Sequence, residues 1–304
     1  MRIAITGGTG FVGRNLAERL RSSADASEPV IISRSTGIRI DDADALTAAF
    51  EGCDAVAHFA GINREIGEQT YERVHVRGTA AVIEAAQRAG VRKVVLLSFL
   101  RARPNCGSPY HESKWAAEEL LRASGLDYTI LKAGMIYGRG DHLVDHLSRI
   151  VQTVPLFASV GIHQKPIRPI PVAELVNVAV AALGDRLSRQ TVGVVGGEQL
   201  MMSKAVKRVA DVVGRHVFVF PAPVWAHYLL GAATELTMAV PLVATAQVRM
   251  LAEGVTEVAQ PASELPADLR PRLPFDREQI RMALPDPGGF TWRDLRFAKA
   301  SASG

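Results

Sequence analysis

Tyr110 and Lys114 stand four residues apart in the segment YHESK, within a stretch whose apolar spacing predicts a helix. Side chains four residues apart project from one face of a helix. A phenol on such a face can carry acid-base chemistry if a ligand reaches it. Ser98 lies twelve residues before Tyr110 and ends a predicted buried strand. In an open parallel sheet, ligands gather at that edge.

A glycine-rich turn lies near the start of the chain, in the segment TGGTGFVG. Its glycines are three residues apart and stand between a predicted strand and a predicted helix, which is the context of a dinucleotide-binding turn. Without side chains the backbone can approach a diphosphate, and the helix dipole offsets its charge. We therefore predict a bound nicotinamide dinucleotide; a tight turn without ligand is the alternative interpretation. The predicted contacts here are Gly7, Gly10, Phe11, Val12 and Gly13.

The end of the second predicted strand indicates which dinucleotide is preferred. An NAD site usually places an acidic residue there to hold the ribose 2′-hydroxyl. This chain has Ser33 and Arg34 instead. Arg34, together with Ser33 and Arg14, could pair with a 2′-phosphate, because a guanidinium matches phosphate oxygens in geometry and charge. The sequence therefore predicts NADP(H), with NAD(H) as the alternative cofactor and a solvated arginine as the alternative interpretation of Arg34.

Three more residues are candidate cofactor contacts. Asp41 could accept a hydrogen bond from the adenine amino group, or it could cap the helix that begins there. Ala60 and Gly61 follow the strand Asp54–Phe59, where small residues allow the backbone close to the cofactor ribose. A tight loop is the alternative explanation for these two small residues.

The elements that must position these residues alternate between short apolar runs and stretches of helical period. This alternation predicts βαβ units and a parallel sheet. The expected strands are Arg2–Thr6, Val30–Ser33, Ala55–Phe59, Val94–Ser98 and Thr129–Lys132. The expected helices of this region are Phe11–Arg21, Thr70–Ala89 and Glu112–Ala123.

We predict an α/β fold with a Rossmann-type, doubly wound parallel sheet and a smaller, mostly helical C-terminal substrate region. The dinucleotide-binding domain is expected over residues 1–150, joined by a strand near 191–196, and the substrate-binding or lid region over 151–304. Helices are expected at Leu143–Val151, Val172–Leu183, Ser203–Val213 and, as two packed helices, within Trp225–Leu251.

Composition narrows the expected partners. The formal net charge of +4 and the pI near 9.2 mildly favour anionic molecules, but basic residues form no long runs, so nucleic acid is not expected.

Cys53 and Cys106 are too few for a disulfide framework or a usual metal-ligand set, and no metal site is expected. The glycine turn begins at residue 7, which leaves no room for a signal peptide and predicts a cytoplasmic protein.

The segment Pro221–Val248 is markedly apolar, but Glu235 and Pro241 interrupt it. Two packed helices are therefore favoured over a membrane span. The part Val224–Val248 could line or cover a cleft for a hydrophobic substrate. Association with a membrane surface is left open but is not favoured.

The sequence resembles the short-chain dehydrogenase/reductase superfamily. The motifs TGGTGFVG and DAVAHFAG, then Ser98 and Tyr110-x-x-x-Lys114, occur in the family's order. More closely, the chain resembles atypical or extended members: the accessory NAD(P)H-binding subunit of mitochondrial complex I and bacterial NAD-dependent epimerase/dehydratase-like proteins. That resemblance is carried by GTAAVIEAAQRAGVRKVVLLS, YHESKWAAEELLRASGLDYTILKAGMIYGRGD and RPIPVAELVNVAVAAL.

The resemblance implies a role for each polar residue. Tyr110 would exchange a proton with the substrate oxygen while hydride moves to or from the nicotinamide. Lys114 would favour the phenolate and bond the nicotinamide ribose, and Ser98 would hold the substrate oxygen. The chain departs from its relatives at His75, where many have asparagine; it is interpreted as a structural histidine, or as an anchor for water or a backbone carbonyl.

Two classes of function follow from these motifs. The first is an NADP(H)-dependent oxidoreductase acting on a hydrophobic or anionic small molecule, or a nucleotide-sugar epimerase or dehydratase using transient hydride transfer. The second is a non-catalytic NAD(P)H-binding accessory or redox-sensing protein. Turnover that depends on Tyr110 distinguishes the first class from the second.

Overall fold

A computed structural model describes residues 1–22, 27–141, 143–237, 243, 245–285 and 288–290. Contacts divide the chain into two compact units. The first contains Met1–Gly134, Val172–Val194 and Glu257–Pro271, and the second contains Met135–Pro171, Val195–Thr256 and Arg272–Gly304. The chain passes between the units several times, so each unit combines segments that are distant in the sequence.

The first unit is built on a six-stranded sheet in which all described pairs are parallel, in the order β10-β5-β4-β3-β1-β2. The strands are β1 (Arg2–Thr6), β2 (Glu28–Ile32), β3 (Ala55–His58), β4 (Lys93–Phe99), β5 (Asp127–Ala133) and β10 (Gln190–Val194). Successive strands extend from β1 in both directions, so the order reverses between β1 and β3. Ligands of open α/β sheets bind beside such a reversal.

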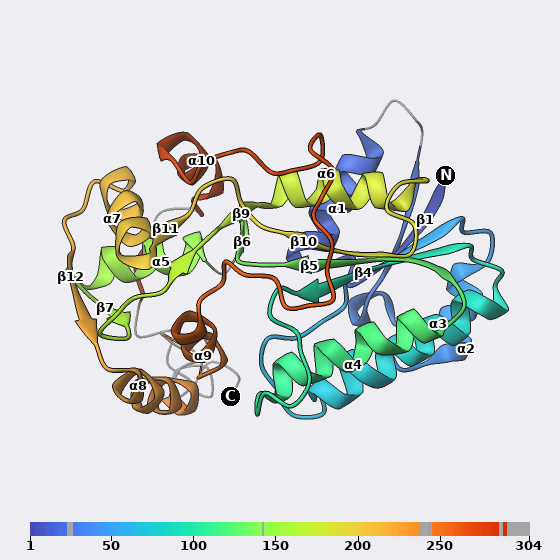
Figure 1. The fold of residues 1–304 in the computed structure, drawn as a ribbon, viewed down its shortest axis with the longest axis horizontal. Helices are drawn as coiled ribbons and strands as arrows, with labels where there is room; N and C mark the ends of the chain where they lie inside the picture. The colour runs from blue at the N-terminus through green and yellow to red at the C-terminus, as the bar shows by residue number, and fades with distance from the viewer. Residues whose placement is uncertain (23–26, 142, 238–242, 244, 286–287, 291–304) are drawn as a thin grey trace, which may run out of the picture. The chain divides into compact units, whose positions relative to one another are not determined.

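Helices cover both faces of this sheet (Figure 1). One face carries α1 (Phe11–Arg21) and α6 (Val172–Leu183), and the other carries α2 (Ala43–Phe50), α3 (Gly78–Arg88) and α4 (Pro109–Ala123). This is the predicted Rossmann-type, doubly wound arrangement, and it is confirmed. Central strands such as β3 are apolar and buried, as expected where helices cover both faces of a sheet.

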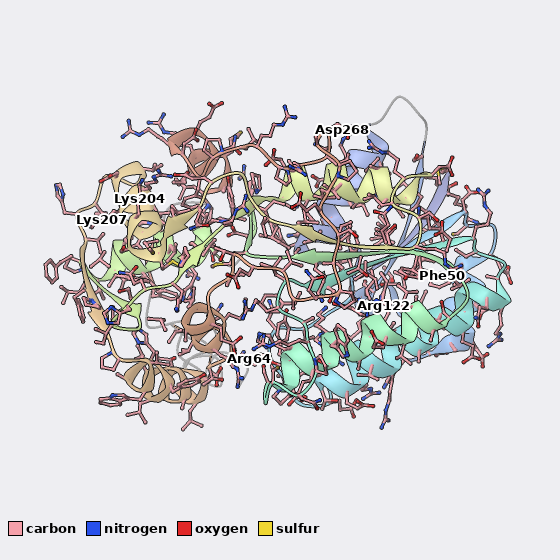
Figure 2. The ribbon with its side chains drawn as sticks, viewed as in Figure 1. Phe50, Arg64, Arg122, Lys204, Lys207 and Asp268 are labelled. Carbon is pink, nitrogen blue, oxygen red and sulfur yellow. The ribbon has the colours of Figure 1, made fainter. Side chains whose placement is uncertain are left out.

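The core under α2, α3 and α4 joins helix and strand side chains. Phe50, labelled in Figure 2, ends α2 and is fully buried. Val82 of α3 and Leu121 of α4 are fully buried in the same core. Burial of each large side chain contributes roughly 1.5–3 kcal/mol relative to its exposed state. These contacts hold the helices of this face against the sheet and fix the position of α4, which carries the candidate catalytic pair.

One predicted helix differs in detail. The sequence predicts a single helix over Thr70–Ala89, but the structure has a π-helical segment, Glu72–Arg77, followed by α3 from Gly78. π-helical turns widen a helix locally and are frequent near functional sites. Here the wider turn contains the buried His75.

The second unit is mostly helical with short strand pairs. Its helices are α5 (Val144–Thr153), α7 (Met202–Val212), α8 (Val224–Thr237), α9 (Thr245–Glu253) and α10 (Arg277–Ala283). Its strands are β6 (Ile136–Tyr137), β7 (Leu156–Val160), β8 (Pro166–Ile167), β9 (Ile170–Pro171), β11 (Leu200–Met201) and β12 (Phe218–Ala222). A separate apolar core includes Leu147, Val206 and Phe275.

Two helices, α8 and α9, cover the apolar segment, as the sequence predicts, and α9 continues past Val248 to Glu253; residues 238–242 and 244 lie outside the described residues. Among the helices that the structure describes, none is both long and apolar enough to cross a membrane.

Candidate functional site

The glycine turn connects β1 to α1 by close backbone contacts. Gly7 has φ +69°, a left-handed conformation that favours glycine. A Cβ on Gly13 would lie 2.3 Å from the Gly7 carbonyl oxygen, whereas one on Gly10 would lie 3.1 Å from the same atom. Gly13 therefore needs to be glycine for the turn itself, and Gly10 is less constrained.

The start of α1 suits a negatively charged ligand. Gly10 caps the helix without a side-chain hydrogen bond, and the first turn, which contains Phe11 and Val12, has no acidic residue. The amides of this turn and the helix dipole favour an anion. The predicted diphosphate contacts thus meet at one helix start, and the residues present fit a dinucleotide.

Ser33 and Arg34 follow β2 in a short 3₁₀ turn, Arg34–Thr36. Ser33 caps this turn and exchanges hydrogen bonds with Thr36. Arg34 is exposed, and so is Arg14 on α1. The side chain of Arg34 makes no hydrogen bond or ion pair with any other residue that the structure describes, so its guanidinium is open to a ligand.

Asp41 is held by two arginines. Its carboxylate pairs with Arg73 at 2.7 Å and with Arg39 at 3.3 Å. The alternative role of Asp41 as a helix cap is wrong, because α2 begins one residue later than expected. Asp42 caps it, and its side chain accepts a hydrogen bond from the Ala45 amide at 3.0 Å. A contact of Asp41 with adenine stays a prediction.

Ala60 and Gly61 join the glycine turn to α4. A Cβ on Gly7 would lie 2.7 Å from the Ala60 amide nitrogen, and a Cβ on Gly61 would lie 3.0 Å from the Lys114 Nζ. The first contact brings the backbone after β3 against the turn after β1. The second brings the ammonium of α4 against the same short segment, so these residues meet at the reversal of strand order.

Lys114 is buried, and its Nζ donates to the Leu97 carbonyl at 3.3 Å. Burial lowers its pKa to about 8, while the charge of Glu118 acts in the opposite direction. The ammonium form therefore predominates at pH 7. This positive charge is held against the backbone at Gly61.

His75 holds the loop after β3. Its Nε2 accepts a hydrogen bond from the Ile62 amide at 3.1 Å, so its Nδ1 donates to Ser113 at 2.9 Å. Burial, with the charge of Lys114, lowers the pKa of His75 to about 2, and the ring is neutral. In this position the histidine is a structural residue that ties the loop to α4.

A second buried histidine was not among the predicted site residues. His58 ends β3 and contacts Thr6 at 2.7 Å and Thr79 at 3.0 Å. Because the Thr79 hydroxyl donates to the His75 carbonyl, it accepts from His58 Nε2, and Nδ1 accepts from Thr6. Burial lowers the pKa of His58 to about 3. The series of hydrogen bonds links the end of β1 to the turn of His75.

Tyr110 lies in the first turn of α4, within a group of aromatic rings. Its ring centroid lies 5.4 Å from that of Phe99, 5.6 Å from that of Tyr71 and 5.8 Å from that of His75. The hydroxyl makes a long contact of 3.5 Å with Asn63 Oδ1. Burial raises the pKa of Tyr110, and Tyr71 adds to the shift, so the phenol is protonated at neutral pH.

Ser98 belongs to a buried ionic network. Its hydroxyl donates to Glu118 Oε1 at 2.5 Å, and Glu118 Oε2 lies 3.2 Å from Lys132 Nζ and 2.7 Å from Arg122. Glu118 and Lys132 are fully buried, and Arg122 lies one turn further along α4 (Figure 2). The structure therefore places the Lys114 ammonium against Gly61, beside the glycine turn. The Ser98 hydroxyl, in contrast, is hydrogen-bonded to Glu118.

The members of this network other than Ser98 were not among the predicted site residues. Lys132 stands in the apolar run of β5, where a lysine is an exception that could have signalled a buried partner. Glu118 follows Lys114 by one helical turn, and nothing in the local pattern marks it as buried.

Comparisons with known proteins identify similar chains and folds. Residues 7–149 match a family model described as NAD(P)H-binding. The chain is 32% identical over 153 residues to a ceramide reductase of Caulobacter vibrioides, covering 46% of this chain and 47% of that enzyme. It thus spans about half the length of that relative. It is 27% identical over 244 residues to the photosystem II assembly factor Ycf39 of Synechocystis, covering 73% and 71% of the two chains.

The fold is similar to that of a solved UDP-glucose 4-epimerase from Thermus thermophilus in complex with NAD. The TM-score is 0.66 at 20% identity, with 93% of this chain and 97% of the other covered. At this identity the likeness concerns the fold alone.

Proposed function

Since residues 7–149 form an NAD(P)H-binding domain, with structural neighbours among NAD-dependent epimerases and reductases of the short-chain dehydrogenase/reductase type, we propose that this chain is an NADP(H)-dependent oxidoreductase. Tyr110 is its general acid and base. Its substrate is a small molecule with a carbonyl or the corresponding alcohol.

One observation carries the proposal: backbone contacts connect the diphosphate turn to the catalytic helix. Gly7 lies against Ala60, and the next residue, Gly61, lies against the Lys114 ammonium. A dinucleotide that extends from the α1 start past Gly61 therefore reaches Lys114. A glycine turn that only connected a strand to a helix would not require the buried Lys114 ammonium nearby. Burying a charge is unfavourable, so its presence beside Gly61 supports a ligand at this site.

The nicotinamide, when bound, supplies or accepts the hydride. Lys114 provides a fixed positive charge, since its pKa of about 8 leaves it mostly protonated at pH 7. Tyr110 is protonated under the same conditions, because burial raises its pKa. A protonated phenol is the form that donates to an oxygen that gains negative charge during carbonyl reduction. Reduction is therefore the direction that this chain's own residues favour.

Oxidation needs the phenolate, and therefore a cation near Tyr110. Lys114 lies on the same face of α4, one turn away, and a positive charge lowers the pKa of a nearby phenol. The substrate contact of Ser98 stays a prediction, because in this structure its hydroxyl donates to Glu118.

The proposed preference for NADP(H) rests on Arg34, which is exposed and free of other described partners. We expect wild-type protein to bind NADPH more tightly than NADH in a fluorescence titration. The Arg34→Ala variant should lose roughly ten- to hundred-fold in NADPH affinity, the equivalent of one charged hydrogen-bond pair, with NADH affinity unchanged. Arg21→Ala, at the far end of α1, is the matched control. Tighter binding of NADH by the wild type excludes the preference.

A non-catalytic accessory or redox-sensing role is the second candidate. One observation favours it: the Ser98 hydroxyl is bonded to Glu118. The relative Ycf39 is named as an assembly factor. Incubation of NADPH-loaded protein with a panel of carbonyls and quinones separates the candidates. Consumption of NADPH supports the enzyme, and its absence across the panel supports the accessory role.

A third candidate is an epimerase or dehydratase acting on a nucleotide sugar, in keeping with the fold of the Thermus thermophilus structure. Such a reaction regenerates its dinucleotide in every cycle. Analysis of nucleotide-sugar products from protein loaded with oxidised cofactor distinguishes it from the reductase, because the epimerase changes the sugar without net consumption of cofactor.

A further inference from the structure

The loop after β3 leads from the glycine turn to Tyr110. Its start, at Gly61, lies against the Lys114 ammonium. Two residues later, Asn63 Oδ1 accepts a long hydrogen bond from the Tyr110 hydroxyl at 3.5 Å. Arg64 is the next residue, and Figure 2 labels it near the start of α4. An arginine thus follows directly after the residue that contacts the Tyr110 hydroxyl.

Hydrogen bonds anchor the loop on both sides of Arg64. The Asn63 carbonyl accepts from the Tyr71 hydroxyl at 2.9 Å, and Glu65 Oε1 accepts from the Tyr71 amide at 2.7 Å. Backbone hydrogen bonds of 3.1 and 3.0 Å close the turn 66–69. A residue in a loop that is already ordered binds a ligand without the entropic cost of fixing the loop.

The Arg64 guanidinium has no acceptor in the part of the chain that the structure describes. The side chain is half-buried, and its Nη1 atom is buried without a hydrogen bond. The acids of the same loop have other partners: Glu65 accepts from the Tyr71 amide, and Glu68 pairs with Arg73 at 2.9 Å. Buried polar groups are normally paired, because removing them from water is unfavourable. The position therefore suits the acceptor group of a bound anion.

The order of contacts along the loop separates the cofactor from the substrate. The proposed cofactor has its diphosphate at the start of α1 and its ribose at Lys114, and the nicotinamide ring carries no negative charge. Along the loop, Gly61 lies against the ammonium and Asn63, two residues later, contacts the Tyr110 hydroxyl. An anion at Arg64 therefore belongs to the molecule that reacts at Tyr110.

We propose that Arg64 binds a carboxylate of the substrate, so that the substrate is an oxo acid or the corresponding hydroxy acid. A guanidinium donates two parallel hydrogen bonds to a carboxylate. One cation in this loop lacks an acceptor, and it balances the single charge of a carboxylate, whereas a phosphate monoester carries nearly two. This inference rests on the proposed reductase function and names its substrate class.

The test compares 2-, 4- and 5-oxohexanoate with their methyl esters, which keep the carbonyl and lose the charge. Binding is measured by isothermal titration with NADP⁺-loaded protein, which cannot reduce the probes, and reduction is measured with NADPH-loaded protein. We expect at least one acid to bind more tightly than its ester. Arg64→Ala should weaken binding of that acid roughly ten- to hundred-fold and leave ester binding unchanged. Arg64→Lys should retain part of the affinity, and in reduction the loss should appear in KM.

Arg92→Ala is the matched control, because it removes an arginine that is 78% exposed and lies before β4. It should bind the acids as wild type does, and circular dichroism establishes that each variant is folded. The inference is overturned if no acid binds, if acids and esters bind equally, or if Arg64→Ala binds the acids as wild type does. A parallel loss of NADPH affinity in Arg64→Ala also overturns it, because the guanidinium then belongs to the cofactor site.

Failure of the proposed function gives a different result. Binding of an acid that depends on Arg64, without consumption of NADPH, supports the anion site and counts against the reductase. Reduction of acids and esters at equal rates in wild type and Arg64→Ala supports the reductase and refutes the anion site.

Discussion

Glu118 and Lys132 form an ion pair, with 3.2 Å between Oε2 and Nζ, in which neither side chain is accessible to solvent. The pair joins α4 to β5, and Ser98 adds a hydrogen bond from β4. Lys132 also donates to the Ala102 carbonyl at 3.0 Å. The Glu118 carboxylate thereby holds both β4 and β5 to α4, and its charge raises the pKa of Lys114 against the effect of burial.

We predict that Glu118→Gln destabilises the protein by about 3–5 kcal/mol, because it leaves the Lys132 ammonium buried without its counter-ion. Glu119→Gln, at the neighbouring half-exposed carboxylate that pairs with Arg122, should cost no more than about 1 kcal/mol. Urea unfolding measures both. Equal losses in the two variants contradict the assigned role.

The same variant should change the titration of Lys114. Without the carboxylate of Glu118, the pKa of Lys114 falls below about 8, since the remaining influence is burial. Where Glu118→Gln remains folded, the pH above which NADPH affinity declines should move downward. An unchanged pH profile would mean that Glu118 acts only on stability.

Gly13→Ala and Gly10→Ala should have very different effects. The added Cβ at position 13 meets the Gly7 carbonyl oxygen at 2.3 Å, whereas that at position 10 meets it at 3.1 Å. We expect Gly13→Ala to lose NADPH binding and roughly 1–3 kcal/mol of stability, because backbone must move. Gly10→Ala should retain most of the stability. Isothermal titration and thermal unfolding measure the two effects, and equal stability losses count against the turn geometry.

Acid should destabilise the first unit through its two buried histidines. The pKa values of His58 and His75 are lowered to about 3 and about 2, so both stay neutral in the fold while the unfolded chain protonates them below about pH 6.5. Stability is therefore present above pH 6.5 and is lost as the pH falls toward 3. Each histidine contributes a slope of roughly 1 kcal/mol per pH unit.

The raised pKa of Asp141, about 6 because of burial, acts in the opposite direction between about pH 4 and 6. The informative quantity is therefore the difference between wild-type protein and His75→Asn in urea unfolding from pH 7 to pH 4. In His75→Asn, the part of the change in unfolding free energy with pH that is due to the two histidines should be about half as steep. Parallel stability curves for the two proteins are the contrary result.

The sequence predicted the sheet well because its signals are local. The bounds of Arg2–Thr6, Phe11–Arg21 and Val172–Leu183 agree with the structure. Each is an apolar strand or an amphipathic helix that ends at a turn, and the glycine segment connects the first strand to the first helix as predicted. These features depend on the periodicity of neighbouring residues rather than on distant contacts.

What could not be predicted depends on distant partners. Ser98 and Glu118 are twenty residues apart, and their hydrogen bond appears only when α4 packs on β4. The orientation of α8 was equally hidden, because both of its faces contain apolar or small residues. The face with Gly231 is buried since only that face permits the close approach of α9.

We propose that Tyr110 moves the proton in an NADPH-dependent reduction. The most direct measurement compares single-turnover NADPH oxidation by wild-type protein and by Tyr110→Phe with the same carbonyl substrate. We predict that the variant binds NADPH as the wild type does but reacts ~10²- to 10⁴-fold more slowly, the usual contribution of general acid catalysis. Equal rates for the two proteins would contradict the account.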